Sequence, residues 1–198
     1  HPDIVRTLNG SSIITDHDAY PDINHTKADI SGLMHHKFCF NDHMVWSGST
    51  NPTIEGLHHN DNNMLVIHNK QIASFYADIY HELQHNTIQP KSITINQHNL
   101  SLTIHNCRHN CIDHIISHIK AANQSIHFMI FTFTHPRIIT ALVDAYSRNI
   151  TIKGIVEENS ASHNAYHILK RHGIDIEFDH NPATMHHKVW IIDDTVIT

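Results

Sequence analysis

The sequence predicts an α/β fold, and three of its features support this prediction. In residues 111–198, stretches with helical spacing of apolar residues alternate with short apolar runs rich in β-forming residues. Such alternation is typical of helices layered on a largely buried sheet. The first half also combines short apolar runs with one helical pattern, and 40% of the 198 residues are hydrophobic. That length and apolar content are enough for one ample core or two small ones.

The elements of the second half follow in a regular order. Helices are expected over 111–123, where Ile112, Ile115, Ile116 and Ile119 recur at helical spacing, over 135–149, where Pro136 lies near the start, and over 160–173, which ends at Gly173. Strands are expected over the apolar segments between and after these helices, namely 125–133, 150–158, 174–180, 186–193 and 195–198.

The first half begins with a turn-rich stretch, residues 1–33. Strands are expected at 34–42, 44–51 and 63–69, and a helix at 70–85, where Ile72, Phe75, Ile79 and Leu83 share a face. Residues 86–99 have the polarity and the proline of a linker, although 92–96 could form a strand.

The net charge, the histidine content and the lengths of the apolar runs bear on which ligands and surroundings the protein suits. The net charge of −6 gives no overall attraction to nucleic acid or to an anionic membrane, but a local cationic site remains compatible with it. The 24 histidines are scattered, which favours compositional bias over metal binding. No apolar run is long enough to span a bilayer, so no transmembrane segment is expected.

The three cysteines, an odd and small number, predict no disulfide framework. Cys107 and Cys111 stand near His105 and His109, and this run could hold zinc. Its spacing is not that of a common zinc finger or zinc ribbon. The preferred interpretation is a loop that leads into a helix, and no metal site is expected.

One short motif occurs twice. "MHHKFCFND" begins at residue 34 and "MHHKVWIID" at residue 185, each with an Asp five positions after the Lys. On a strand, residues two apart point to the same face, so His35 and Lys37 should project together, as should His186 and Lys188. Asp42 and Asp193 stand at an odd offset from the His and are expected to pin the following turn. Two such copies are hard to obtain by chance.

Two His and two Lys that meet across a pseudo-dyad suit the cleavage of a phosphodiester. Lysines neutralise the anion, one imidazole attacks phosphorus, and the other, protonated, donates to the leaving oxygen. Gly48 permits an unusual backbone angle, and Ser49 and Asn51 can direct a hydroxyl and an amide toward the same place as His35.

At these residues the chain resembles the phospholipase D superfamily, whose signature is HxK-x4-D followed by GSxN. Over 112–198 it is most similar to the bacterial and archaeal nuclease-like members. The resemblance implies a two-lobed α/β/α sandwich with mixed sheets, here truncated at both ends. Residues 1–90 would be the later part of the first lobe, 91–101 a linker, and 102–198 the earlier part of the second lobe.

The resemblance also implies a metal-independent phosphodiesterase that needs no cofactor. His35 would form a phosphohistidine and His186 would act as the acid; Lys37, Lys188 and Asn51 would hold the phosphate, and Ser49 would support the site. The acidic residue that usually follows GSxN would be Asp61. The GSxN of the second repeat is missing, and cut lobes could associate with one another.

The substrate stays open at this point. DNA or RNA is preferred because of the nuclease-like resemblance, with a phospholipid or a catalytically silent, nucleic-acid-binding protein as alternatives. No basic stripe with interleaved aromatics marks a nucleic-acid track, and Arg137, Lys170 and Arg171 read equally well as solvated helix residues. The compartment is not predicted.

Overall fold

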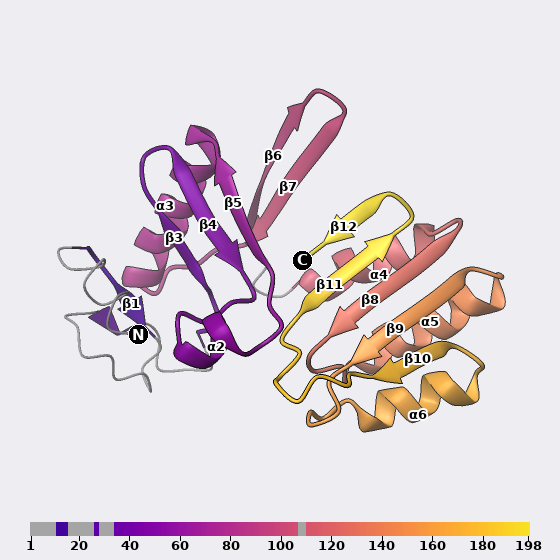
Figure 1. Cartoon of the computed structure of the whole chain (residues 1–198). Coiled ribbons are helices and arrows are strands. Elements are labelled where there is room, and N and C mark those ends of the chain that lie inside the picture. Colours follow the sequence, from indigo (N-terminus) through magenta and orange to yellow (C-terminus); the bar gives the residue numbers. More distant parts are fainter. Residues whose placement is uncertain (1–10, 16–25, 28–33, 107–109) are drawn as a thin grey trace. The chain divides into compact units, whose positions relative to one another are not determined.

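The computed structural model describes residues 11–15, 26–27, 34–106 and 110–198 (Figure 1). The chain divides into two compact units. The first contains residues 1–54 and 64–109, and the second contains 55–63 and 110–198. The turn-rich stretch predicted over 1–33 lies mostly outside the described residues. Each unit is described by itself below.

The second unit is built on a five-stranded mixed sheet in the order β10-β9-β8-β11-β12. Three strands are parallel to one another: β8 (Ser125–Ile130), β9 (Thr151–Val156) and β10 (Asp175–Phe178). β11 (Lys188–Ile192) is antiparallel to β8, and β12 (Thr195–Ile197) is antiparallel to β11. The predicted α/β class, with a mixed sheet, is confirmed.

Three helices cover one face of this sheet (Figure 1). They are α4 (Cys111–Ala121), α5 (Pro136–Ser147) and α6 (His163–Arg171), close to the predicted segments. Pro136 is the first residue of α5, where its fixed φ suits a helix start. α6 ends just before Gly173, whose φ of 85° closes a helix without steric cost.

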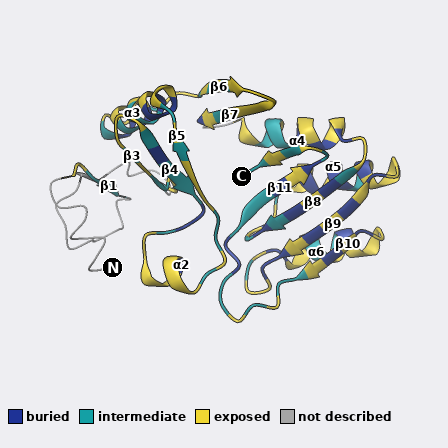
Figure 2. Ribbon diagram, turned by 45° about the horizontal axis from the view of Figure 1, so that its top comes forward, coloured by how far each residue is buried: buried dark blue, intermediate teal, exposed yellow. Residues whose placement is uncertain are grey.

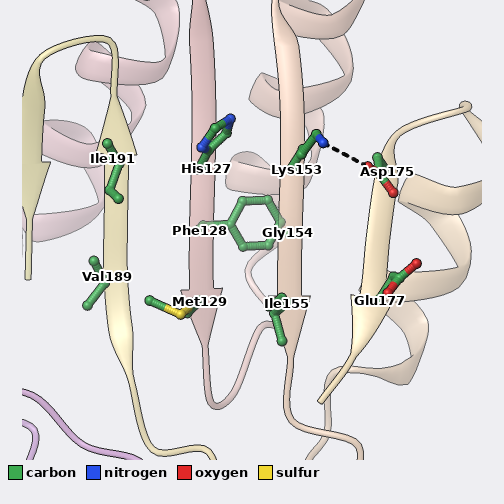
Figure 3. Close-up of a pocket in the computed structure, with 10 residues that line it drawn as sticks. All are labelled: His127, Phe128, Met129, Lys153, Gly154, Ile155, Asp175, Glu177, Val189 and Ile191. Carbon is green, nitrogen blue, oxygen red and sulfur yellow. Dashed lines mark ion pairs between the residues drawn. The ribbon is translucent and has the colours of Figure 1, made fainter. Parts of the chain in front are cut away.

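The sheet has one buried and one exposed face, because side chains alternate along each strand (Figure 2). Ile126, Phe128 and Ile130 of β8 are buried against the helices, whereas His127 is exposed on the other side. Figure 3 shows this other face, where apolar and charged side chains line a shallow hollow of about 370 Å³. The hollow is lined by none of the motif His, Lys or Asp residues, although Val189 and Ile191 of the second motif contribute to it. No second helical layer covers this face within the described residues.

A glycine allows a buried aromatic cluster to form on the helix-covered side of the sheet. Gly154 lies directly beside Phe128 in the parallel β8–β9 register. The Phe128 ring lies over Gly154, and a Cβ placed there would be 2.2 Å from the ring (Figure 3). The same ring packs 5.0 Å from the ring of Trp190 on β11. Because Gly154 has no side chain, the Phe128 ring can lie over β9 and also contact Trp190, so the contact joins β8, β9 and β11.

The first unit contains an antiparallel sheet of β3 (Phe38–Phe40), β4 (Met44–Gly48) and β5 (Met64–His68). Helix α3 (Lys70–Gln84) packs on it through Ile72 and Ala73, and Asn69 caps its start by accepting from two backbone N–H groups. Three shorter elements are the strands β1 (Ile14–Thr15) and β2 (Thr26–Lys27), which pair in parallel, and helix α2 (Ile54–His58), most of which belongs to the second unit.

The segment 91–101, expected to be a linker, instead lies in a hairpin of β6 (Lys91–Gln97) and β7 (Leu100–Asn106). Ile93 and Ile104 on one face of the hairpin pack against the apolar face of α3. Ser92 and Thr94 alternate with the isoleucines and are exposed. This period-two alternation is the signal of a half-buried strand, and the strand considered as the alternative at 92–96 lies within β6.

Cys111 takes part in a disulfide, which the odd cysteine count did not predict, whereas Cys39 is free and exposed. No group of three or more potential metal ligands occurs among the described residues; the predicted alternative at 105–111 falls partly outside them. None of the helices in the described ranges is long and apolar enough to cross a membrane.

We expect Gly154→Ala to lower the free energy of unfolding by about 1–3 kcal/mol, because the added methyl group displaces the Phe128 ring from a packed core. Urea denaturation measures this loss. In a Phe128→Leu background the same glycine substitution should cost less, since the clashing ring is gone. An equal cost in both backgrounds would contradict the proposed contact.

Candidate active site

The second motif lies where β11 begins. Lys188 is the first residue of the strand, and His186 comes just before it, so the motif histidine is not on the strand as predicted. β11 runs antiparallel to β8, and Lys188 pairs with Ile130, the last residue of β8. The start of β11 therefore lies beside the ends of β8 and β9, where Phe131 and Glu157 follow.

The backbone on either side of Met185 pairs with the segment that contains Asp61. The His186 N–H donates to the Asp61 carbonyl at 2.8 Å, and the Asp61 N–H donates to the Thr184 carbonyl at 3.0 Å. Asp61 and Met185 form a parallel bridge. This pairing satisfies two backbone N–H groups and two carbonyls, and His186 is 7% exposed. The histidine is therefore held by its main chain as well as by its ring.

The His186 ring contacts two side chains. Its Nδ1 lies 3.2 Å from the Asn62 Oδ1, and its ring centroid lies 4.9 Å from that of Phe131. Asp61 was expected only as the acidic residue that follows GSxN, and its carboxylate accepts from the Asn181 amide. The next residue, Asn62, meets the ring with a neutral amide.

A buried carboxylate anchors the loop before His186. Glu157, 3% exposed, follows β9 and accepts from the Met185 N–H at 2.7 Å and from the Asn159 N–H at 3.0 Å. Both carboxylate oxygens thus have backbone donors, which offsets the cost of burying the group. Because Met185 precedes His186 directly, Glu157 sets the position from which the histidine projects.

The two motif lysines make the same local bond. Lys188 donates from its ammonium to the His186 carbonyl at 2.8 Å, and Lys37 donates to the His35 carbonyl at 3.0 Å. Lys188 Nζ also lies 5.1 Å from the Phe131 ring centroid. Burial lowers the pKa of Lys37 from its ordinary value. In each motif the lysine thus bonds back to the main chain of the histidine two residues before it.

The first motif gathers its residues at one end of the first unit's sheet. His35 and Lys37 precede β3, while Ser49 and Asn51 follow β4. Since Phe38 pairs with Ser47 in the antiparallel register, these residues share a sheet end. Ser49 is 7% exposed, and Gly48 has a φ of 151°, a conformation that side-chain-bearing residues rarely adopt. His35, Lys37, Ser49 and Asn51 thus form one group, and His186 and Lys188 form another in the second unit.

The two motif aspartates lie in the turns after β11 and β3. Asp193, with a φ of 51°, accepts through Oδ1 from the N–H groups of Gln124 and Ser125 and through Oδ2 from that of Asn123, each at 2.9 Å. This matches the structural role expected from its offset. The backbone donors, that of Ser125 first, lower the pKa of Asp193 from its ordinary value.

In the first motif the turn is held differently. Asn41 Oδ1 accepts from the N–H groups of His43 and Met44, each at 2.9 Å, while Asp42 is exposed between them. An Asn side chain that bonds to the backbone two residues on is a common turn stabiliser. The expected role of Asp42 in this turn is therefore filled by its neighbour Asn41.

Sequence reasoning missed three residues around His186, namely Asn62, Glu157 and Phe131. Asn62 stands in a polar run that reads as loop, and Glu157 and Phe131 follow strands without any motif around them. The available signal was positional: Phe131 and Glu157 stand near the carboxyl ends of two predicted strands, 125–133 and 150–158. Residues at the carboxyl ends of such strands commonly build sites.

Comparison with known proteins places these observations in a family. Residues 14–84 and 115–198 match the family described as "Cardiolipin synthase, PLD-like domain". Phospholipase D of Rickettsia conorii is 29% identical over 85 residues, which cover 42% of each chain. Mitochondrial cardiolipin hydrolase of Xenopus tropicalis is 28% identical over 78 residues, which cover 38% of this chain and 37% of the relative. The aligned part spans about two fifths of these relatives.

Two solved structures are similar to parts of this chain or to most of it. Nuc of Salmonella typhimurium, a phospholipase D family member, is 28% identical with a TM-score of 0.42, covering 55% of this chain and 68% of that chain. Polyphosphate kinase of Porphyromonas gingivalis has a TM-score of 0.61 at 11% identity, covering 94% of this chain and 35% of its own. The second likeness concerns the fold alone and extends over nearly the whole chain.

We expect Asp193→Asn to destabilise the protein at neutral pH, because the amide nitrogen would face backbone donors. The folded-state pKa of Asp193 is lowered, so its contribution is present above the ordinary value of 3.8 and is lost as the pH falls through the lower folded-state pKa. The difference in urea midpoint between wild type and variant should therefore be larger at pH 7 than at pH 3. Asp194→Asn, at the exposed neighbour, is the control; if it has the same effect, the three-donor arrangement does not stabilise the fold.

We expect Glu157→Gln to lower the free energy of unfolding by about 1–3 kcal/mol, since its amide can accept only one of the two backbone bonds well. Glu158→Gln at the adjacent, exposed position should have almost no effect. Chemical denaturation of both variants checks this, and equal midpoints for the two would show that the buried carboxylate is not an anchor.

Proposed function

Because the chain belongs to the phospholipase D superfamily, we propose that it is a phosphodiesterase that works through a phosphohistidine intermediate. The observation that carries this proposal is the repetition of one local geometry. In both motifs a lysine ammonium bonds the carbonyl of the histidine two residues before it. The two copies thus share a local geometry as well as a sequence, which is expected of two copies of one kind of phosphate site.

The proposed reaction uses the histidines and lysines of both motifs. The Nε2 of one histidine attacks phosphorus, and the bond from phosphorus to the leaving oxygen breaks as that oxygen takes a proton from the other histidine. Lys37 and Lys188 offset the charge on the phosphoryl oxygens, and Asn51 and Ser49 add hydrogen bonds. Water then attacks phosphorus, the second histidine takes its proton, and a phosphate monoester and free imidazole are released.

We propose a nucleic acid, DNA or RNA, as the substrate. Phe131 supports this choice because its half-buried ring lies beside the Lys188 ammonium, 5.1 Å from the ring centroid. An aromatic face next to a cation suits a base stacked beside its backbone phosphate. A phospholipid is the second candidate, favoured by the names of the relatives from Rickettsia and Xenopus. A binding protein without turnover is the third.

Cleavage of an end-labelled single-stranded oligonucleotide in excess EDTA tests the proposal. We expect wild-type cleavage to persist, and His35→Ala and His186→Ala each to lower the rate by about 10²–10⁴-fold or more, because each removes a nucleophile or an acid. His118→Ala, which removes an exposed imidazole from α4, should leave the rate unchanged.

The same variants assayed on phosphatidylcholine and cardiolipin vesicles separate the substrates. Histidine-dependent turnover of lipid without turnover of the oligonucleotide would replace the nuclease proposal with a lipase. Tight, salt-sensitive DNA binding without any turnover would identify a binding protein. Cleavage that survives in both histidine variants would contradict the assigned site.

A further inference from the structure

The Asn62 side-chain amide has a fixed orientation. Its Nδ2 donates to the Gly56 carbonyl at 2.8 Å and to the Asn60 carbonyl at 3.3 Å. Carbonyl oxygens accept and cannot donate, so the nitrogen of the amide must face them. The Oδ1 therefore faces His186 Nδ1 at 3.2 Å. Two independent contacts thus determine which end of the amide meets the imidazole.

We propose that Asn62 is a positioning residue that sets the tautomer and the charge of His186. The Asn62 Oδ1 can only accept a hydrogen bond, so His186 Nδ1 must carry a proton. In the neutral imidazole the lone pair then resides on Nε2. In the imidazolium form Nε2 carries the second proton. In either form Nε2 is the nitrogen available for chemistry, and Nδ1 serves to hold the ring.

The neutral amide also affects the balance between these two forms. A carboxylate at this place would stabilise the imidazolium and raise the pKa of His186; an amide gives no such compensation. The surrounding carboxylates have other donors: that of Asp61 accepts from Asn181, and that of Glu157 accepts from Met185 and Asn159. Among the described residues, further titratable groups of this region are Lys188, whose ammonium bonds the His186 carbonyl, and His187 and Asp179.

This arrangement makes His186 a stronger acid than a carboxylate-paired histidine would be. That property suits the donation of a proton to a leaving oxygen, the role expected for His186, and in this respect the inference rests on the proposed function. The tautomer and the pKa are properties of the ring itself, however, and can be measured without any substrate.

Histidine NMR of the full chain tests the inference directly, with the His186 signals assigned by their loss in His186→Gln. In the wild type, nitrogen shifts should show the proton on Nδ1 of the neutral ring. Asn62→Asp should raise the His186 pKa by about one unit or more. Asn62→Ala should allow the neutral ring to carry its proton on Nε2 as well as on Nδ1. Asn63→Asp adds the same charge one residue away, where the native amide bonds Thr198 Oγ1 at 2.7 Å, and should give a smaller shift.

Where a substrate is turned over, Asn62→Asp should also move the high-pH limb of the kcat profile upward by the same amount, while Asn62→Ala should lower kcat with little change in KM. An equal His186 pKa in Asn62→Asp and Asn63→Asp, or an unchanged tautomer in Asn62→Ala, would overturn the inference. Failure of every activity assay with the expected NMR result would instead refute the proposed function alone.

Discussion

The antiparallel pairing of β11 with β8 is the constraint that positions His186 and the residues around it. β8 and β9 are parallel, so their carboxyl ends meet at one edge of the sheet, and the antiparallel β11 begins at that same edge. This brings the ring of Phe131 and the carboxylate of Glu157 to the residues that precede the strand. A parallel β11 would start at the opposite edge, and a slip by one residue would turn Trp190 and Ile192 out of the core.

Local periodicity explains what the sequence predicted well. The helices and strands of residues 111–198 were found near their predicted positions because apolar spacing, Pro136 and Gly173 all act within a few residues. The structural role of Asp193 followed from the same kind of reasoning, since an odd offset from His186 places it in the turn. The α/β class and the grouping of His35 with Ser49 and Asn51 at one sheet end rest on such short-range rules as well.

The parts that sequence reasoning missed depend on distant contacts. Asn62 and His186 are 124 residues apart, and Glu157 and Met185 are 28 apart, with nothing local to pair them. Asp61 was considered as the acidic residue after GSxN and Asn62 was not singled out, whereas the bridge between Asp61 and Met185 sets the register in which Asn62 meets the ring. The β6–β7 hairpin was read as a linker because half of each strand faces solvent and is polar.

The membership of residues 55–63 in the second unit has a consequence for the order of folding. This segment is made early, but its partners around Thr184 and His186 emerge from the ribosome more than a hundred residues later. Closing so long a loop costs entropy that a few backbone bonds repay only once the sheet behind them exists. The contacts between His186 and the Asp61–Asn62 segment should therefore be among the last to form. A nascent chain would carry this segment unpaired while the first unit is already complete.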